Sequence, residues 1–266
     1  MDNFYGNLNF STLETEIDFY VEEINLRGYC IINSLISPDE ISKVKNSIYN
    51  IYELQKTNFG EERLEKINDK DMARCLLKYD FSTFRALAFN PIILKLVNAL
   101  IKQKFILGLQ NAIINRTIDH HQGSWHRDLP YQNFVCNEIL SVNALWAMND
   151  FSVHNGGTCL LPYSMNFHNM PSKKFSEENL VQPEVPAGSV IVFNSMLLHR
   201  AGANKSKEER IAINHQYIRP FIQPQYYFNE IEEIVQQTLS DSELDVLGFN
   251  FNSSRDDIDW RNARYK

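Results

Sequence analysis

The chain has 266 residues, of which 44% are hydrophobic and 22% are charged, and its formal net charge is −7 at pH 7. This composition is too apolar for a disordered protein, and the length allows one large domain with a sizeable core. The negative net charge, with lysines and arginines scattered along the chain, argues against a nucleic-acid partner.

The sequence predicts neither a secretory signal nor a membrane span. The first thirty residues contain no basic segment followed by an apolar stretch, so no secretory signal is expected. No window approaches the roughly 20 apolar residues that span a bilayer. The four cysteines lie far apart and form no CxxC pair, which disfavours a disulfide framework or a structural zinc site. Because free thiols suit a reducing compartment, we expect a cytoplasmic protein.

Helical patterns open the chain. Apolar residues recur at helical spacing from Leu13 to Ile24, and Gly28 ends the pattern. Residues 28–33 form a short β-prone run. Residues 56–80 are charged and weakly patterned, which is typical of loops and short helices.

Two later helix starts are indicated by their capping residues. Ser-Pro-Asp-Glu at 37–40 combines an N-cap serine, a proline in the first turn and a glutamate three residues after the serine. The helix that follows is expected to reach about residue 55. Asn-Pro at 90–91 predicts another helix, which ends near residue 102.

The second half of the chain has a β pattern. Short β-prone runs alternate with turn residues, a spacing that favours an antiparallel sandwich or barrel. A helical pattern returns at 228–239. The simplest organisation is one domain over 1–266, with a helical N-terminal part (1–104), a β core (105–221) and a C-terminal helix and tail (222–266). The β-prone runs lie at 105–116, 139–148, 157–162, 189–194 and 210–219.

Two places in the β region contain candidate metal ligands. His126 and Asp128 are two residues apart, so both side chains point to one face of a strand. His199 ends a run that begins at Val190, and it could add a second imidazole from a distant strand. Such a facial triad leaves three positions open, as non-haem iron(II) oxygenases need. A lone HxD is a weak signal, because it is more often a surface feature or a hydrogen-bonded histidine.

Arg210 strengthens the interpretation. It precedes an aliphatic run, so it opens a strand, and a guanidinium that faces the interior needs an anion to offset its desolvation. The distal carboxylate of 2-oxoglutarate is a good candidate, because arginine binds carboxylates through two parallel hydrogen bonds. The alternative is a surface arginine paired with Glu208 or Glu209. Taken with the three candidate ligands, the functional interpretation is preferred.

At these residues the sequence resembles the phytanoyl-CoA dioxygenase family of iron(II)/2-oxoglutarate oxygenases. The resemblance covers nearly the whole chain, and its segments occur in the family's order with sensible spacing. They are the entry strand and helix at 28–40, Trp125-His126-Arg127-Asp128, the stretch at 146–165, and Pro186-Ala-Gly-Ser-Val-Ile-Val-Phe leading to His199, with Asn204, Ser206 and Arg210 after it.

The resemblance implies a mainly β fold with flanking helices, built on a double-stranded β-helix (jelly-roll, cupin-like) core. It also implies a dioxygenase that uses Fe(II), 2-oxoglutarate and O2 to hydroxylate a small molecule, with release of succinate and CO2. The HxD pair and His199 would hold the iron, and Arg210 would hold the tail of 2-oxoglutarate. Gln110 and Asn143 are further candidates for hydrogen bonds to 2-oxoglutarate, and their alternative is an amide at the surface or at a sheet edge.

The sequence departs from the family pattern at one turn. The family commonly has Pro-Gly-Ser-His where this chain has Pro162-Tyr163-Ser164-Met165, so the turn is expected to differ while no metal ligand is lost. Related halogenases have Gly or Ala at the position of Asp128, which leaves room for a chloride ligand. The carboxylate at Asp128 therefore disfavours halogenation.

The segment after the HxD pair should border the open iron positions. Tyr131, Gln132 and Trp146 are therefore candidates for a substrate pocket, although core packing is an equal alternative for Trp146. Arg127 points away from its two neighbours in a regular strand, so we expect it to form a structural ion pair.

The remaining histidines are weaker candidates for metal binding. His120 and His121 lack a matching carboxylate and are expected to be solvated. His154 and His168 are expected in loops. His215 should face away from Arg210, because it lies five residues along the same strand.

Two other functions remain open at this point. One is a cupin-like metalloenzyme that does not use 2-oxoglutarate, in which Arg210 has no assigned role. The other is a non-catalytic β-helix protein that binds a ligand or partner and has no need of all four residues. The sequence does not identify the substrate, the oligomeric state, or whether the product is hydroxylated, desaturated or epoxidised.

Overall fold

The computed structural model describes residues 9–116, 123–129, 132–228, 231–251 and 253–265. The N-terminal elements are α1 (Glu16–Arg27), β1 (Tyr29–Ile32), α2 (Pro38–Phe59), α3 (Glu61–Lys66), β2 (Met72–Arg74), α4 (Leu76–Tyr79), α5 (Phe81–Ala88) and α6 (Pro91–Ile101). They are followed by β3 (Ile106–Asn115), β4 (Ser141–Ala147), β5 (Thr158–Leu160), α7 (Lys173–Asn179), β6 (Val190–Asn194), β7 (His199–Ala201) and β8 (Arg210–Ile218). The C-terminal elements are α8 (Glu233–Gln236), α9 (Asp241–Val246), the 3-10 turn η2 (Phe249–Phe251) and α10 (Asp257–Asn262).

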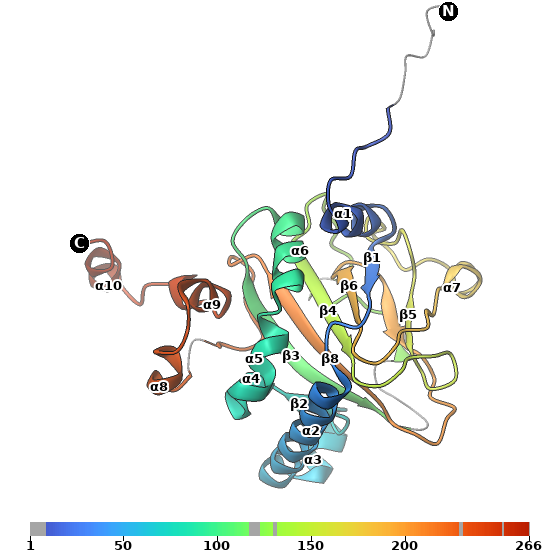
Figure 1. The fold of residues 1–266 in the computed structure, drawn as a ribbon, viewed down its shortest axis with the longest axis horizontal. Coiled ribbons are helices and arrows are strands. Elements are labelled where there is room, and N and C mark those ends of the chain that lie inside the picture. Colours follow the sequence, from blue (N-terminus) through green and yellow to red (C-terminus); the bar gives the residue numbers. More distant parts are fainter. Residues whose placement is uncertain (1–8, 117–122, 130–131, 229–230, 252, 266) are drawn as a thin grey trace, which may run out of the picture.

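The strands form two antiparallel sheets. The larger sheet has the order β1-β6-β4-β8-β3-β2, and the smaller sheet pairs β5 with β7. In Figure 1 the smaller sheet lies beside one side of the larger sheet, while α1, α2, α5 and α6 lie along its other parts. This arrangement confirms the predicted fold, a double-stranded β-helix with flanking helices.

The two faces of the larger sheet bury different sets of residues. Strand alternation sends Ala144, Trp146 and Ile213 into a core that is shared with the helices, and α6 packs against β4 there. The opposite face sends Leu145 and Ala212 into a second core, under the smaller sheet. Polar residues on this second face are therefore available to a site between the two sheets.

The predicted helix starts are confirmed by their caps. Ser37 and Glu40 form a capping box at the start of α2, and Asn90 caps α6. The first helix starts later than its apolar pattern suggests, because a capping box at Thr15 fixes the start of α1. The helix α2 runs past residue 55 and ends at Gly60, whose φ is +97°.

The expected helix at 228–239 is wrong in extent. Helix α8 covers only four residues, and Ser240 starts a separate helix, α9, through a capping box with Glu243. A serine in this position competes with the preceding turn for the backbone, so one helical pattern becomes two short helices.

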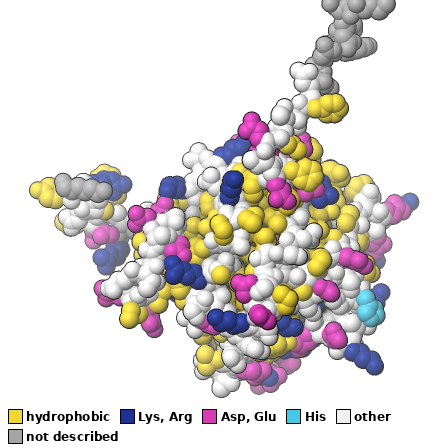
Figure 2. Space-filling model, viewed as in Figure 1, with side chains coloured by type: hydrophobic (Ala, Val, Ile, Leu, Met, Phe, Trp, Pro, Cys, Tyr) yellow, Lys and Arg dark blue, Asp and Glu magenta, His cyan; other side chains and the backbone are white. Residues whose placement is uncertain are grey.

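The molecular surface is mixed in charge on the side that Figure 2 presents, where lysines and arginines alternate with acidic side chains. Among the helices that the structure describes, none is by itself long and apolar enough to cross a membrane. Only the pair α5 and α6, bent by 49°, has that length and composition when taken together.

Candidate metal centre

The HxD segment lies alongside β7. The backbone N–H of His126 donates to the carbonyl of His199, and the N–H of His199 donates back, each over 3.0 Å. The N–H of Asp128 donates to the carbonyl of Ser195, also over 3.0 Å. These bonds place two segments that are 73 positions apart in the sequence next to each other, so His126, Asp128 and His199 share one side.

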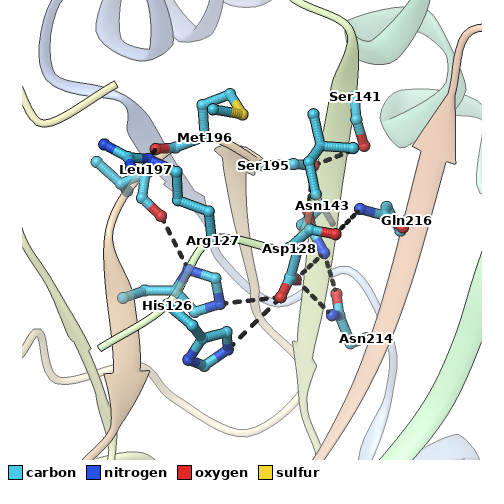
Figure 3. A network of polar contacts seen from close by, with 12 residues as sticks. His126, Arg127, Asp128, Ser141, Asn143, Ser195, Met196, Leu197, Asn214 and Gln216 are labelled. Carbon is cyan, nitrogen blue, oxygen red and sulfur yellow. Dashed lines mark hydrogen bonds and ion pairs between the residues drawn. The ribbon is translucent and has the colours of Figure 1, made fainter. Parts of the chain in front are cut away.

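The three side chains converge on one point, as the sequence predicts. The Nε2 atoms of His126 and His199 each lie 3.5 Å from Oδ1 of Asp128, and the three donor atoms all lie within 4.8 Å of one another. Two donors at right angles on one ion, each at about 2.1 Å, are separated by about 3 Å. The spacing is therefore close to that of three ligands on one face of an ion (Figure 3).

Backbone carbonyls orient both imidazole rings. Nδ1 of His126 lies 2.9 Å from the carbonyl of Ser124, and Nδ1 of His199 lies 2.9 Å from the carbonyl of Leu197. A carbonyl only accepts hydrogen bonds, so each Nδ1 carries a hydrogen, and each Nε2 is the atom whose lone pair can bind a metal in place of a proton. This tautomer is the one that a metal ligand requires.

The carboxyl group of Asp128 is held in its ionised form. Burial opposes its ionisation, but His199, His126 and the hydrogen bond from Asn214 outweigh burial and lower the pKa of Asp128 to about 2. Burial also opposes the charge on His199, and the carboxylate of Asp128 overcomes this effect and raises the pKa of His199. The site therefore carries an anion that a cation can share with both rings.

Arg210 lies at the same cavity and has no charged partner among the residues described. It is 2% exposed, and its Nε has no hydrogen-bond partner. Glu209, which the alternative interpretation would pair with it, instead accepts bonds from Tyr49 and Arg116. Burial lowers the pKa of Arg210 to about 10. The lining of this cavity joins the three candidate ligands and Arg210 to Ile113, Leu145, Thr158, Phe193, Arg200, Ala201 and Asn214.

Gln110 and Trp146 do not belong to this cavity, which corrects two sequence-based assignments. Gln110 accepts a bond from the N–H of Leu77, and its Nε2 lies 2.8 Å from Nε2 of His215. Nε1 of Trp146 donates to Nδ1 of His215 over 3.2 Å. All of these contacts are on the helix-covered face of the larger sheet, so strand alternation carries both side chains away from the metal centre.

Two residues next to the HxD pair stabilise its turn. Gln132 accepts a bond from the N–H of Arg127 and donates to the carbonyls of Arg127 and Leu129, so its amide is engaged in the turn and is not free to bind a substrate. The guanidinium of Arg127 donates to four backbone carbonyls, and no acidic side chain in the described ranges pairs with it. The expected ion pair of Arg127 is therefore wrong. The carbonyls belong to Gln132, Met196, Ser164 and Phe167.

The other predicted residues fall in different places. Tyr131, His120 and His121 lie outside the described residues. His215 faces the helices, as strand alternation predicts, and burial lowers its pKa to about 3. His168 contacts the carbonyl of Asn133 in a loop, as expected.

Sequence reasoning missed Asn214 and Gln216, which both contact Asp128. Nδ2 of Asn214 donates to Oδ2 of Asp128, and Nε2 of Gln216 donates to its carbonyl. Both lie an even number of residues after Arg210 in β8, so the strand period alone could have placed them on the face of Arg210.

The residues present fit both iron(II) and 2-oxoglutarate. Two neutral imidazoles and one carboxylate are the donor set of the facial triad. Arg210 adds a buried guanidinium whose Nε is without a partner, and a carboxylate is the group that satisfies it best.

Comparisons with known proteins identify relatives of this chain. A profile of the family described as Phytanoyl-CoA dioxygenase (PhyH) matches residues 24–212. The protein named "Uncharacterized protein Rv1501" of Mycobacterium tuberculosis is 31% identical over 217 residues, which cover 79% of this chain and 78% of that protein. The protein named "Dioxygenase af480" of Aspergillus fumigatus is 24% identical over 174 residues, covering 63% of this chain and 55% of that protein.

Two solved structures share the fold. AviO1 from Streptomyces viridochromogenes has a TM-score of 0.60 at 20% identity, and the match covers 80% of this chain and 99% of AviO1. EctD from S. alaskensis, solved with 2-oxoglutarate and 5-hydroxyectoine, has a TM-score of 0.63 at 14% identity, with 77% of each chain covered. At these identities the likeness concerns the fold.

Proposed function

Because this chain belongs to the phytanoyl-CoA dioxygenase family, we propose that it is an iron(II)- and 2-oxoglutarate-dependent oxygenase acting on a small molecule. The proposed reaction hydroxylates the substrate and releases succinate and CO2. The observation that carries the proposal is the placement of Arg210, with its partnerless Nε, in one cavity with His126, Asp128 and His199.

Each residue has a distinct role in this proposal. The two Nε2 atoms and Oδ1 of Asp128 would hold iron(II), which supplies the oxygen chemistry when it is bound. Arg210 would bind the distal carboxylate of 2-oxoglutarate through parallel hydrogen bonds and so orient the opposite end toward the metal. Ile113, Leu145 and Phe193 are the large apolar side chains of the cavity lining, and they would limit the access of water to the reacting atoms.

The main alternative is a metalloenzyme of the same fold that does not use 2-oxoglutarate. A cavity with the triad alone would serve it equally well. The buried Arg210 favours the dicarboxylate, because without an anion a buried guanidinium is costly.

Anaerobic calorimetry can test the proposal with Mn(II) as a redox-inert metal. We expect 2-oxoglutarate to bind the Mn(II)-loaded protein at least tenfold more tightly than 2-oxopentanoate, which lacks the distal carboxylate, and to bind the metal-free protein weakly. Equal affinity for the two oxoacids would contradict the role of Arg210 and favour the alternative. In air, iron(II) should then support the release of succinate from 2-oxoglutarate.

A further inference from the structure

Asp128 accepts hydrogen bonds on only one of its two carboxylate oxygens from the amides around it. Nδ2 of Asn143 donates to Oδ2 over 2.6 Å, and Nδ2 of Asn214 donates to the same Oδ2 over 3.1 Å. Oδ1 is the oxygen that lies 3.5 Å from both imidazole Nε2 atoms. We propose that Asn143 and Asn214 are positioning residues that restrict Asp128 to a single metal bond, through Oδ1. The inference rests on the proposed function, because it concerns how the same site holds its metal.

The amide of Asn143 is fully occupied. One hydrogen of Nδ2 is donated to Asp128, and the other is donated to Oδ1 of Asn214 over 2.9 Å. Its own Oδ1 accepts a bond from Ser195, whose hydroxyl lies 2.6 Å from that of Ser141. Since an amide nitrogen has only two hydrogens, Asn143 cannot also donate to 2-oxoglutarate. This contradicts the sequence-based assignment of Asn143 to the co-substrate.

Strand pairing fixes the two amides relative to each other. In the register of β4 and β8, Asn143 is opposite Gln216, and Asn214 is opposite Leu145, so the two asparagines are diagonal neighbours on one face. Gln216 adds a bond to the carbonyl of Asp128 over 2.9 Å. Figure 3 shows these side chains on one side of Asp128, away from the imidazoles.

The network is buried and uncharged. Asn143, Ser141 and Ser195 are at most 1% exposed, and Asn214 is 9% exposed. A buried donor that loses its acceptor costs about 1–3 kcal/mol, so rotation of the Asp128 carboxylate away from these donors is opposed. The amides hold the carboxylate in place without adding a positive charge that would compete with the metal for Asp128.

A single metal bond from Asp128 matters for the number of open positions. The facial triad leaves three positions on an octahedral ion, and a bidentate oxoacid with dioxygen needs all three. A carboxylate that bound through both oxygens would take one of them. By engaging Oδ2, the two asparagines keep that position available.

The test compares the isosteric variants Asn143→Leu and Asn214→Leu, and the double variant that combines them, with wild type. Gln110→Leu is the matched control, because Gln110 is a buried amide of the same larger sheet on the opposite face. Mn(II) affinity is measured without oxygen or co-substrate, and water-proton relaxation counts the water molecules on the bound Mn(II). Circular dichroism of the metal-free proteins identifies which variants are folded.

We expect both asparagine variants to lose about 10–100-fold in Mn(II) affinity, as partners of metal ligands generally do, while the control stays within about threefold. The water count should fall from three in wild type to two in the double variant, where Oδ2 is released to bind the metal. A folded double variant with the wild-type affinity and three waters would overturn the inference. Failure of wild type to bind Mn(II) would instead overturn the proposed function, so the two failures are distinct.

If a leucine variant does not fold, Ser195→Ala provides a second route. It removes the hydroxyl that supports Asn143 and leaves every contact of Asp128 in place. A weaker loss of Mn(II) affinity, of about threefold to tenfold, is expected. An unchanged affinity in folded Ser195→Ala would contradict a network that acts as a unit.

Discussion

The guanidinium carbon of Arg210 lies 5.0 Å from the ring centroid of Phe151, and no acidic side chain in the described part of the chain pairs with it. A cation over an aromatic ring is stabilised by about 0.5–2 kcal/mol, which is less than the cost of burying an unpaired charge. Burial of Arg210 is therefore unfavourable in the absence of a ligand, as expected for a residue that binds an anion.

The first prediction concerns the affinity for 2-oxoglutarate. Arg210→Met should weaken its binding to the Mn(II)-loaded protein by about 30-fold or more, because the loss of a buried charged partner costs at least about 2 kcal/mol. The affinity for 2-oxopentanoate should stay the same, because that molecule has no distal carboxylate. Calorimetry with both oxoacids measures the difference, and a loss that is equal for both would point to damage of the metal centre.

The second prediction is that loss of Arg210 stabilises the metal-free protein, although it weakens binding of 2-oxoglutarate. Without metal or co-substrate, Arg210→Met should be more stable than wild type by about 1 kcal/mol, because the variant no longer buries an unpaired charge. Urea unfolding of the two metal-free proteins measures this change. A less stable variant would show that Arg210 has a partner in the folded protein and would remove the argument for an anion site.

The third prediction concerns the turn at the HxD pair. Arg127→Met removes a donor from four backbone carbonyls, and the bonds to Met196 and Ser164 are buried, so the free energy of unfolding should fall by about 2 kcal/mol or more. Mn(II) should bind more weakly, because the turn carries His126 and Asp128. The same substitution at the exposed Arg264 is the control and should change stability by no more than about 0.5 kcal/mol. Wild-type metal affinity in a folded Arg127→Met would contradict this role.

The fourth prediction concerns pH. Burial lowers the pKa of His215 to about 3, below its ordinary value of about 6.5. Between pH 3 and pH 6.5, His215 is therefore protonated in the unfolded chain and neutral in the folded chain. The stability that depends on neutral His215 is present above pH 6.5 and is lost as the pH falls. From pH 7 to pH 5 this loss is about 2 kcal/mol.

Urea unfolding of wild type and of His215→Gln at both pH values measures the effect. Glutamine keeps a polar group beside Gln110 and Trp146 but does not titrate. The variant should therefore lose about 2 kcal/mol less than wild type between pH 7 and pH 5. Identical losses would show that other groups determine the acid sensitivity.

The sequence predicted the long periodic elements and the ligands that form a motif. Ser37 and Asn90 predicted the starts of their helices, and the i, i+2 spacing of His126 and Asp128 predicted that two donors lie together. The strands β2 and β7 have three residues each, which is too short for an alternating pattern to be recognised.

Sequence reasoning placed Gln110 and Trp146 on the wrong face of the sheet. Asn143 and Trp146 lie three positions apart in one strand, so they cannot point to the same side, yet both were assigned to the cavity. Gln110 pairs with His215 across β3 and β8, and only this register shows which face it takes. Asn214 belongs to no motif, because its role depends on where Oδ2 of Asp128 lies.

Anaerobic uptake of iron(II) tests the central claim most directly. Wild type and His154→Ala, which removes a histidine outside the candidate site, should each bind one iron(II) per chain after gel filtration, while His199→Ala should bind none. The claim is contradicted if His199→Ala retains as much iron(II) as wild type, or if folded wild-type protein takes up none.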